Sequence, residues 1–355
     1  KARPARKGDG DRFPSMRKRA KVAHLLERAG FFSLVSRLRA YAPSPWLLVL
    51  TYHSVRPSPG PFDEGVVDAS ASLLDRQMAM VRRLGTPVTL SDLRDAFRRK
   101  RPLPFRPLLV TFDDGYRDNF DIALPILLRH KIRATFFVAT GYVKNRRLFW
   151  WDKLAFMIAR TRKSFVQIDY PKPMEIDLRD RTAANRKVQR IVKDTPELDL
   201  ERFLHAFGEA TEVGLSHSEE RRYADELVLD WAQVKALHEA GMDVQSHTRN
   251  HRVLHTLKKC ELDEELLGAR LELEDVLKAP VFAISYPVGR PIADSAAIRD
   301  AVTSAGYELG FSNASGVNNL WTNVDPLDLR RVSLDRDVED VLFRGMLALP
   351  PLGLR

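Results

Sequence analysis

Leu108–Gly115 reads Leu-Leu-Val-Thr-Phe-Asp-Asp-Gly, and the interpretation of the whole chain starts from this stretch. The apolar and β-branched residues up to Phe112 predict a buried strand that ends at the two aspartates. Adjacent carboxylates at the mouth of a sheet repel each other and are costly to remove from water, and a cation beside them would remove most of that cost. Asp-Asp-Gly also forms simple turns, and alone it favours a turn. A metal site here therefore requires ligands from elsewhere in the chain.

The composition is that of a globular protein with a sizeable core. The chain has 355 residues, of which 44% are hydrophobic, enough for one large domain with additional segments or for two modest domains. Its single cysteine, Cys260, excludes an internal disulfide and any multi-cysteine metal site. No uninterrupted apolar stretch reaches the roughly 18 residues that a transmembrane helix needs.

The net charge of +10 is concentrated at the start of the chain. We expect residues 1–15 to be disordered and Met16–Tyr41 to form a basic amphipathic helix interrupted at Gly30. Residues 1–41 are thus a basic arm before a domain at 42–355. The helix would pack on that domain as a brace or make peripheral contact with an anionic membrane surface. No nucleic-acid-binding motif accompanies the arm, so nucleic acid is not expected as a partner.

Predicted strands and helices alternate along most of the chain, which is typical of a parallel α/β fold. The pattern gives seven or eight βα units and predicts a deformed, closed or partly closed (β/α) barrel, in which chemistry lies at the carboxyl ends of the strands. The predicted strands are Trp46–Tyr52, Pro87–Leu90, Leu108–Phe112, Ala134–Ala139, Asp243–Thr248, Val281–Tyr286, Tyr307–Ser312 and Leu329–Leu334. The predicted helices are Ser70–Leu84, a helix from Asp92 capped by Ser91, Asn119–His130, Trp231–Ala240, Glu261–Leu277, Ile298–Ala305 and Val338–Leu347.

The alternation pauses at residues 144–230, which we interpret as a mostly helical insertion over one end of the barrel. Trp150-Trp151-Asp152 is expected to open a helix, Val166–Leu178 to form a two-stranded excursion, and Arg181–Phe207 to be helical. The aromatic residues Phe149, Trp150 and Trp151 could stack on sugar rings at a cleft rim, but core packing is the more common role of such residues.

Two histidines supply the missing ligands. His247 and His251 lie four residues apart directly after a predicted strand, and on a helical turn both imidazoles would share one face. Two neutral histidines and one carboxylate form a facial metal site with open coordination positions. A histidine pair on a helix can also have a surface or capping role. Together with Asp-Asp-Gly at another strand end, a metal site is the better interpretation, and His255 would lie beyond reach of the same ion.

These motifs resemble the polysaccharide deacetylases of the NodB-homology type, carbohydrate esterase family four. The resemblance spans roughly Leu47 to Asp337 without much of the 144–230 segment. It is carried by Thr111–Gly115 and His247–His251, and also by Leu50–His53, Ala134–Val138, Trp231–Gly241 and Ser285–Gly289. The resemblance implies that Asp113 is the general base and that Asp114 binds a divalent metal together with His247 and His251. The chemistry of such a site agrees, because the oxyanion would form against the metal and a backbone N–H, for which Val288 after Pro287 is the candidate.

The chain departs from the family pattern at two positions. The usual Leu-x-His motif that supplies the general acid is Leu334-Asp335 here, without a histidine. In the branch resembling poly-N-acetylglucosamine deacetylases an early Tyr-His motif supplies this acid, so His53 is our candidate, with a structural hydrogen-bonding role as its alternative.

The second departure is Ser285, where many members have an arginine that steadies the base. Arg331 or Arg290 could replace it, and an inward-facing strand arginine makes Arg331 the preferred candidate. Tyr116, next to Asp-Asp-Gly, would contact substrate through its hydroxyl or simply cover the metal pocket.

The resemblance implies a metal-dependent enzyme that removes N-acetyl groups from an aminosugar in a polysaccharide or a lipid-linked glycan. Zinc is the expected ion, with nickel, cobalt or iron as alternatives. Rival functions are hydrolysis of another acyl group (O-acetyl, formyl or a cyclic amide) and glycan binding by a catalytically weak barrel. The basic start without a recognisable cleavable signal indicates a cytoplasmic protein, peripheral to the inner membrane. Family members often act outside the membrane, so a periplasmic or extracellular location is the alternative.

Overall fold

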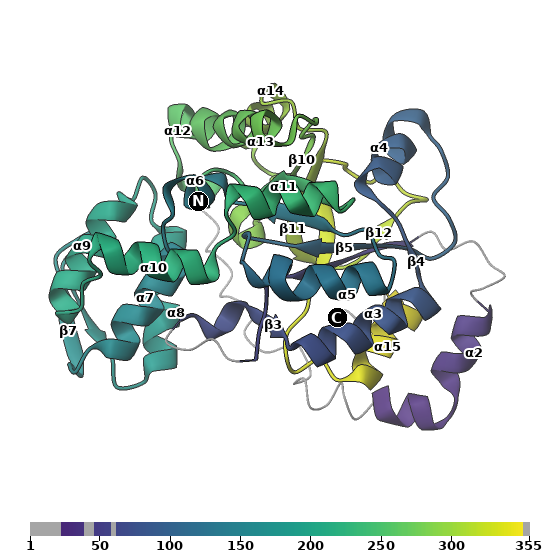
Figure 1. Ribbon diagram of the computed structural model, residues 1–355, viewed down its shortest axis with the longest axis horizontal. Coiled ribbons are helices and arrows are strands. Elements are labelled where there is room, and N and C mark those ends of the chain that lie inside the picture. The colour runs from purple at the N-terminus through teal and green to yellow at the C-terminus, as the bar shows by residue number, and fades with distance from the viewer. Residues whose placement is uncertain (1–22, 39–45, 58–61, 351–355) are drawn as a thin grey trace, which may run out of the picture.

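The computed structural model describes residues 23–38, 46–57 and 62–350 (Figure 1). The expected disorder of residues 1–15 and the first part of the predicted amphipathic helix lie outside these residues. Within the described residues, no helix is long and apolar enough to span a membrane.

In the described part of the chain, seven parallel strands close into a barrel, which confirms the predicted architecture. Their order around the barrel is β1-β13-β11-β10-β9-β6-β5, and β5 pairs back onto β1. The strands are β1 (Trp46–Tyr52), β5 (Pro107–Phe112), β6 (Thr135–Val138), β9 (Asp243–Ser246), β10 (Ala283–Ser285), β11 (Leu309–Ser315) and β13 (Leu329–Ser333). Two short strands lie outside the ring: β4 (Thr86–Pro87) beside β5, and β12 (Asn318–Asn319) antiparallel to β1.

Alternating side chains separate the barrel interior from the surrounding helices, as the two-residue period of a strand requires. Leu47, Val49 and Leu109 belong to an inner apolar cluster, whereas Leu48 and Leu108 pack in the larger cluster with the helices. The apolar runs of β1 and β5 are therefore buried on both faces, as expected for strands of a parallel barrel.

The register between β1 and β5 fixes the height of the aspartate pair. Tyr52 pairs with Phe112, and the Asp113 N–H donates to the Tyr52 carbonyl at 2.8 Å. Because parallel strands end on the same side of the barrel, His53 and Asp113 both emerge at the carboxyl mouth.

Helices surround the barrel in the order expected for βα units. They are α3 (Ala71–Leu84), α4 (Leu90–Arg99), α5 (Leu124–Arg129), α11 (Trp231–Glu239), α12 (Lys259–Asp263), α13 (Ala269–Leu277), α14 (Ala296–Ser304) and α15 (Asp340–Ala348). The two stretches predicted as single helices at 119–130 and 261–277 each contain a π-helical turn, η2 (Asn119–Ala123) and η4 (Glu264–Gly268).

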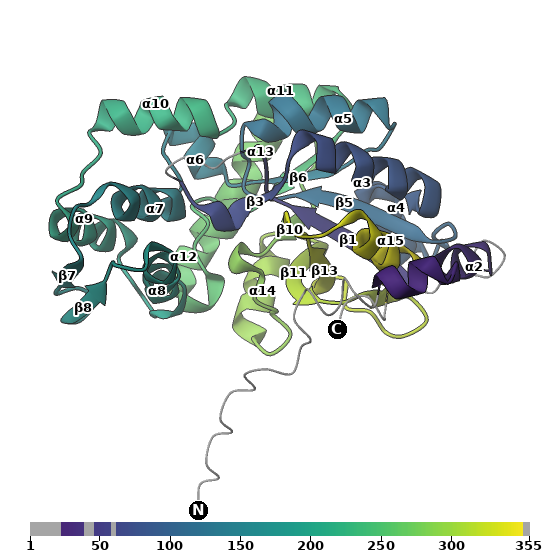
Figure 2. The same cartoon turned by 90° about the horizontal axis from the view of Figure 1, so that it is seen from below.

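The 144–230 segment adds a hairpin and helices to one side of the barrel, visible at the left of Figures 1 and 2. Its elements, with the helix that leads into it, are α6 (Thr140–Asn145), α7 (Trp150–Arg160), β7 (Phe165–Ile168), β8 (Met174–Asp177), α8 (Arg181–Asp194), α9 (Leu200–Thr211) and α10 (His217–Leu227). The helix opening at Trp150 and the two-stranded excursion are confirmed. The single helical stretch predicted for 181–207 is wrong: Pro196 disfavours helix at Thr195, and Asp199 caps a new helix.

The N-terminal helical residues pack on the end of the chain. Residues 23–28 and α2 (Phe31–Leu38) are helical, with the predicted interruption at Gly30, whose φ is +68°. Phe32 is buried beside Gly345 of α15, and Glu27 forms an ion pair with Arg344. Both views show α2 beside α15, so these helices brace the barrel (Figures 1 and 2).

The N-terminus of α4 shows how a neighbouring polar residue misleads sequence-based capping. The prediction of Ser91 as the cap is wrong, because Thr89 and Asp92 form a reciprocal capping box. The Asp92 N–H donates to Thr89 Oγ1 at 3.2 Å, and the Thr89 N–H donates to the Asp92 carboxylate at 2.8 Å.

Thr89→Ala should therefore lower the free energy of unfolding by about 1 kcal/mol, the usual contribution of a helix N-cap. Ser91→Ala is the matched control and should change it by less than about 0.5 kcal/mol, because Ser91 lies inside the helix on the surface. Urea unfolding of both variants measures the difference. A larger loss in Ser91→Ala would contradict the assignment of the cap.

Candidate active site

A cleft of about 930 Å³ opens at the carboxyl mouth of the barrel, between the strand ends and the 144–230 segment. Its floor carries the polar residues expected from the sequence. His53, Asp113, Asp114, His247 and His251 all line it.

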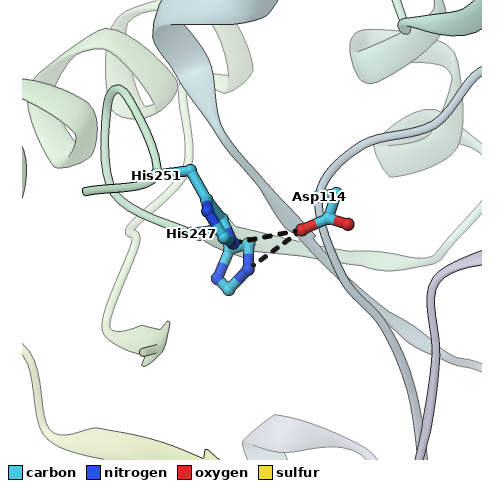
Figure 3. A group of neighbouring side chains, drawn as sticks. All are labelled: Asp114, His247 and His251. Carbon is cyan, nitrogen blue, oxygen red and sulfur yellow. Dashed lines mark ion pairs between the residues drawn. The ribbon is translucent and has the colours of Figure 1, made fainter. Parts of the chain in front are cut away.

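Three buried side chains meet at one point of this floor (Figure 3). The Asp114 Oδ1 atom lies 3.2 Å from His247 Nε2 and 3.4 Å from His251 Nε2. One ligand atom from each residue lies within 4.8 Å of the other two. The predicted ligands thus come together from two strand ends, whereas His255 is not part of this cluster among the described residues.

The two histidines reach this point from a loop, so the expected helical turn is wrong. The loop follows β9, and both Thr248 and His251 have positive φ angles, +62° and +50°. Side chains replace the hydrogen bonds of a helix here: Thr248 Oγ1 accepts from the His251 N–H, and the buried carboxylate of Glu265 accepts from the backbone N–H of Asn250. Such strained backbone is found at functional sites and must be held by its surroundings.

The donor set fits a divalent metal ion. His247 Nδ1 lies 2.8 Å from the Ser285 carbonyl oxygen, which can only accept, so the proton belongs on Nδ1 and a bare Nε2 lone pair faces the Asp114 carboxylate. Two lone pairs facing each other call for a cation between them. Burial lowers the pKa of His251 to about 3, which keeps this imidazole in the neutral form that binds metals.

Asp113 lies beside this group but is held by a different partner. Arg331 donates from Nη1 and Nη2 to the two carboxylate oxygens at 2.9 and 2.8 Å, and both side chains are buried. Burial alone would raise the pKa of Asp113, but the Arg331 guanidinium holds it well below its usual range. Arg331 therefore occupies the place expected for the steadying arginine, while Arg290 forms an ion pair with Asp194 instead.

Ser285 contributes directly to the same carboxylate. Its Oγ donates to Asp113 Oδ2 at 2.9 Å, and its carbonyl orients His247. The sequence marked this position only as a departure from the family pattern. A hydroxyl directly after the buried apolar pair Ala283-Ile284 was the available signal for an inward-facing polar contact.

His53 faces the same cleft and is held by Asp68, which the sequence did not reveal. Asp68 lies in β3 (Val67–Ala69), which pairs with β2 (Ser54–Val55) directly after His53. His53 Nδ1 lies 2.8 Å from Asp68 Oδ2, which also accepts the His53 backbone N–H. Burial would lower the pKa of His53, but the Asp68 carboxylate outweighs it and raises the pKa to about 9. The only local signal was one aspartate inside the apolar run Val66–Ala69.

The hydroxyl of Tyr116 is already hydrogen-bonded within the protein and is not available to a substrate. It is fully buried, donates to Asp152 Oδ2 at 2.9 Å and accepts from the Trp151 indole N–H at 2.7 Å. Substrate contact through this hydroxyl is therefore not supported, and the covering role remains. Trp151 packs against His251 with ring centroids 4.5 Å apart.

The other residues considered as substrate contacts, the aromatic residues 149–151 and the pair Pro287-Val288, differ in whether they reach the cleft. Phe149 is fully buried, which confirms core packing for this residue, whereas Trp150 and Trp151 are only 2% and 3% exposed but also line the cleft. Val288 lines the cleft with a φ of +63°, a costly conformation for a β-branched residue, while Pro287 is buried and does not line it.

Comparison with known proteins agrees with this arrangement. The family model described as polysaccharide deacetylase matches residues 100–310, more than half of the chain, and the chain belongs to that family. Over 105 residues, 28% of this chain, it is 30% identical to the poly-β-1,6-N-acetyl-D-glucosamine N-deacetylases of Escherichia coli K12 and O157:H7. The matched stretch is only 15% of the length of those enzymes.

Solved structures share the fold at low sequence identity. IcaB from Ammonifex degensii has a TM-score of 0.54 and 18% identity, covering 86% of this chain and 98% of its own. The Streptococcus pyogenes deacetylase PplD, solved in complex with acetate, has a TM-score of 0.53 and 18% identity, covering 82% and 93%. The barrel is therefore of the NodB type.

Asp68→Asn should lower the pKa of His53 from about 9 towards its ordinary value of about 6.5, because burial is then opposed only by the attraction of Asp113 and Asp114. The measurement is an NMR titration of the imidazole in metal-free protein. Asp75→Asn is the matched control: it removes the carboxylate 2.7 Å from His130 at the surface and should leave His53 unchanged. An unaltered His53 pKa in Asp68→Asn would contradict the assigned pair.

Proposed function

We propose that this chain is a metal-dependent hydrolase that removes N-acetyl groups from an aminosugar in a polysaccharide or a lipid-linked glycan. The observation that carries the proposal is the division of the aspartate pair: Asp114 faces two histidines, while Asp113 is held by Arg331. Zinc is the ion we favour for two imidazoles and one carboxylate, and nickel, cobalt or iron would also suit this set.

The metal site fits an acyl-transfer reaction in water. Asp114, His247 and His251 would hold the ion, which would act as a Lewis acid that polarises the acyl carbonyl and acidifies water. The backbone around Val288, which lines the cleft, is the proposed place of the carbonyl oxygen during reaction.

Asp113 is the proposed general base. Its Oδ2 lies 4.0 Å from His247 Nε2, so the carboxylate is next to the proposed metal position without competing as a ligand. Arg331 keeps it ionised even though it is buried, so the base remains available in acidic solution. A carboxylate stabilised in this way is a weak base, which is why it would depend on water already acidified by the metal.

His53 is the proposed general acid. A nitrogen leaving group needs a proton, and the pKa of about 9 keeps the imidazole protonated at neutral pH. Because Nδ1 is occupied by Asp68, the Nε2 proton is the one available to the cleft. This pairing accounts for a complete acid and base despite the missing Leu-x-His histidine.

The test is release of acetate together with a free amine from N-acetylated oligosaccharides, with and without a chelator. We expect both products in equal amounts and loss of activity with the chelator. Loss of ester groups without a new amine would favour esterase action, and formate in place of acetate would identify a deformylase. A metal-loaded protein that binds glycans but releases no acid would support the binding-only alternative.

Two aspartate variants separate the proposed roles. Asp113→Asn should reduce kcat by about 10²- to 10⁴-fold, the usual contribution of a general base, while metal content stays at the parent level. Asp114→Asn should lose both metal and activity. Asp121→Asn, at an exposed carboxylate paired with Arg117, is the control and should change neither. If Asp113→Asn retained full turnover, the assigned base would be wrong.

A further inference from the structure

One helix of the 144–230 segment forms a wall of the active-site cleft. The face of α8 that lines the cleft carries Arg181, Thr182, Asn185, Arg186, Gln189 and Lys193. These positions recur at the three- and four-residue spacing of a single helix face. An adjacent side of the same helix packs through Ala184 and Val188 into the apolar core.

Carboxylates on the cleft floor already have partners. Asp113 is paired with Arg331, and Asp68 is paired with His53. Asp114 lies between the two histidines of the proposed metal site. None of these floor residues needs a cation from α8.

The amides of α8 are also engaged. Asn185 Nδ2 and Gln189 Nε2 donate to the buried carboxylate of Asp63, at 3.1 and 2.7 Å. These contacts fix the helix against the neighbouring loop. The remaining oxygen of Gln189 accepts from Lys193 Nζ at 2.9 Å.

Lys193 differs from these groups because its charge forms no close ion pair with a carboxylate of the described residues. Among the described residues no carboxylate lies within 4.0 Å of its ammonium, although the side chain is only partly exposed. Its Nζ lies 5.9 Å from the centre of the Trp150 ring. Burial lowers the pKa of Lys193, while the carboxylates of Asp63 and Asp114, each farther than 4.0 Å from the ammonium, raise it.

Two further guanidinium groups continue the positive charge along the helix. Arg186 lies two turns before Lys193, about 10 Å along the axis, and has no ion pair within the part of the chain that is described. Arg181 donates a hydrogen bond from Nη2 to the Thr161 carbonyl oxygen. Its Nη1 is buried without a hydrogen-bond partner among the described residues. A partly dehydrated cation without a counter-ion is costly, and an anionic ligand would offset that cost.

We propose that this face of α8 binds an anionic group of the substrate, so that the enzyme acts on an acidic glycan rather than a neutral one. The group is a phosphate or a carboxylate carried on, or next to, the sugar that bears the acyl group. This inference rests on the proposed function and specifies its substrate class.

The opposite charge elsewhere in the cleft restricts where the anion can lie. Asp335 and Asp337 line the cleft from the loop after β13 and would repel it. Lys193 lines the same cleft as His247 and His251. The anion therefore lies on the α8 side of the reacting sugar.

The experiment compares N-acetylated oligosaccharides of equal length that differ in charge. The probes are an uncharged chitin oligosaccharide, the same oligosaccharide phosphorylated at its reducing end, and a hyaluronan oligosaccharide in which carboxylates alternate with N-acetylglucosamine. Binding is measured by calorimetry and turnover by acetate release, both with the metal-loaded full chain. We expect one or both charged probes to bind about tenfold more tightly than the uncharged one, and this preference to weaken with added salt.

Variants of α8 assign the preference to Lys193. Lys193→Gln should reduce the ratio of affinities between charged and uncharged probes by about tenfold, and Arg186→Gln by less because it is more exposed. Lys187→Gln is the matched control on the same helix: Lys187 is exposed, does not line the cleft and donates to the Glu175 carbonyl. It should leave the ratio unchanged.

The outcomes separate this inference from the proposed function. Equal affinity for charged and uncharged probes, or an equal loss of the ratio in Lys187→Gln and Lys193→Gln, would overturn the acidic-glycan assignment. Acetate release at equal rates from charged and uncharged probes would support the proposed deacetylase and overturn the acidic-glycan proposal. Charge-selective binding without release of acetate from any probe would support the binding wall and contradict the deacetylase. If Lys193→Gln does not fold, as judged by circular dichroism, Arg186→Gln carries the comparison. An unchanged ratio in that variant then overturns the proposal.

Discussion

A guanidinium buried in the barrel mouth determines what the aspartate pair can do. Arg331 meets both oxygens of Asp113, and each side chain is at most 1% exposed. Neither charge could remain there alone, because an unpaired buried ion costs several kcal/mol. The pair therefore holds Asp113 as a carboxylate and directs it away from the ligand set. Asp114, one residue later and with a φ of +74°, turns toward the histidines.

The closed barrel makes this division possible. Asp113 follows β5 and Arg331 lies on β13, and both of these strands pair with β1. The bidentate contact forms because β5 and β13 lie on either side of β1, each in register with it. His53 leaves the same central strand and reaches Asp68 through a short parallel pair. The proposed base and acid thus leave the neighbouring strands β5 and β1, while the two metal-site histidines come from the loop after β9.

A structural feature could be predicted from the sequence when the residues that determine it lie close together in the chain. The buried strands were predictable because apolar runs such as β1 are long and continuous, and Asp-Asp-Gly marked the end of β5. The meeting of Asp114 with His247 and His251 was predictable from strand ends and a family resemblance. The loop that carries the histidines was not, because the hydrogen bonds that fold it come from Thr248 and from Glu265, more than a dozen residues away.

Contacts over long sequence distances account for the other gaps. Asp68 touches His53 through a loop whose length says nothing about its path, and Tyr116 is closed off by Asp152 and Trp151 from the 144–230 segment. The polar face of α8 looks like an ordinary solvated helix face in the sequence. Only its position against the strand ends makes it part of the cleft.

The most direct test of the account is diffraction from crystals of zinc-loaded protein, measured at the zinc absorption edge. The account predicts one anomalous peak in the cleft bonded to Asp114, His247 and His251, with Asp113 still joined to Arg331. A zinc ion bonded to Asp113, with Arg331 displaced, or a peak away from these three ligands would contradict it.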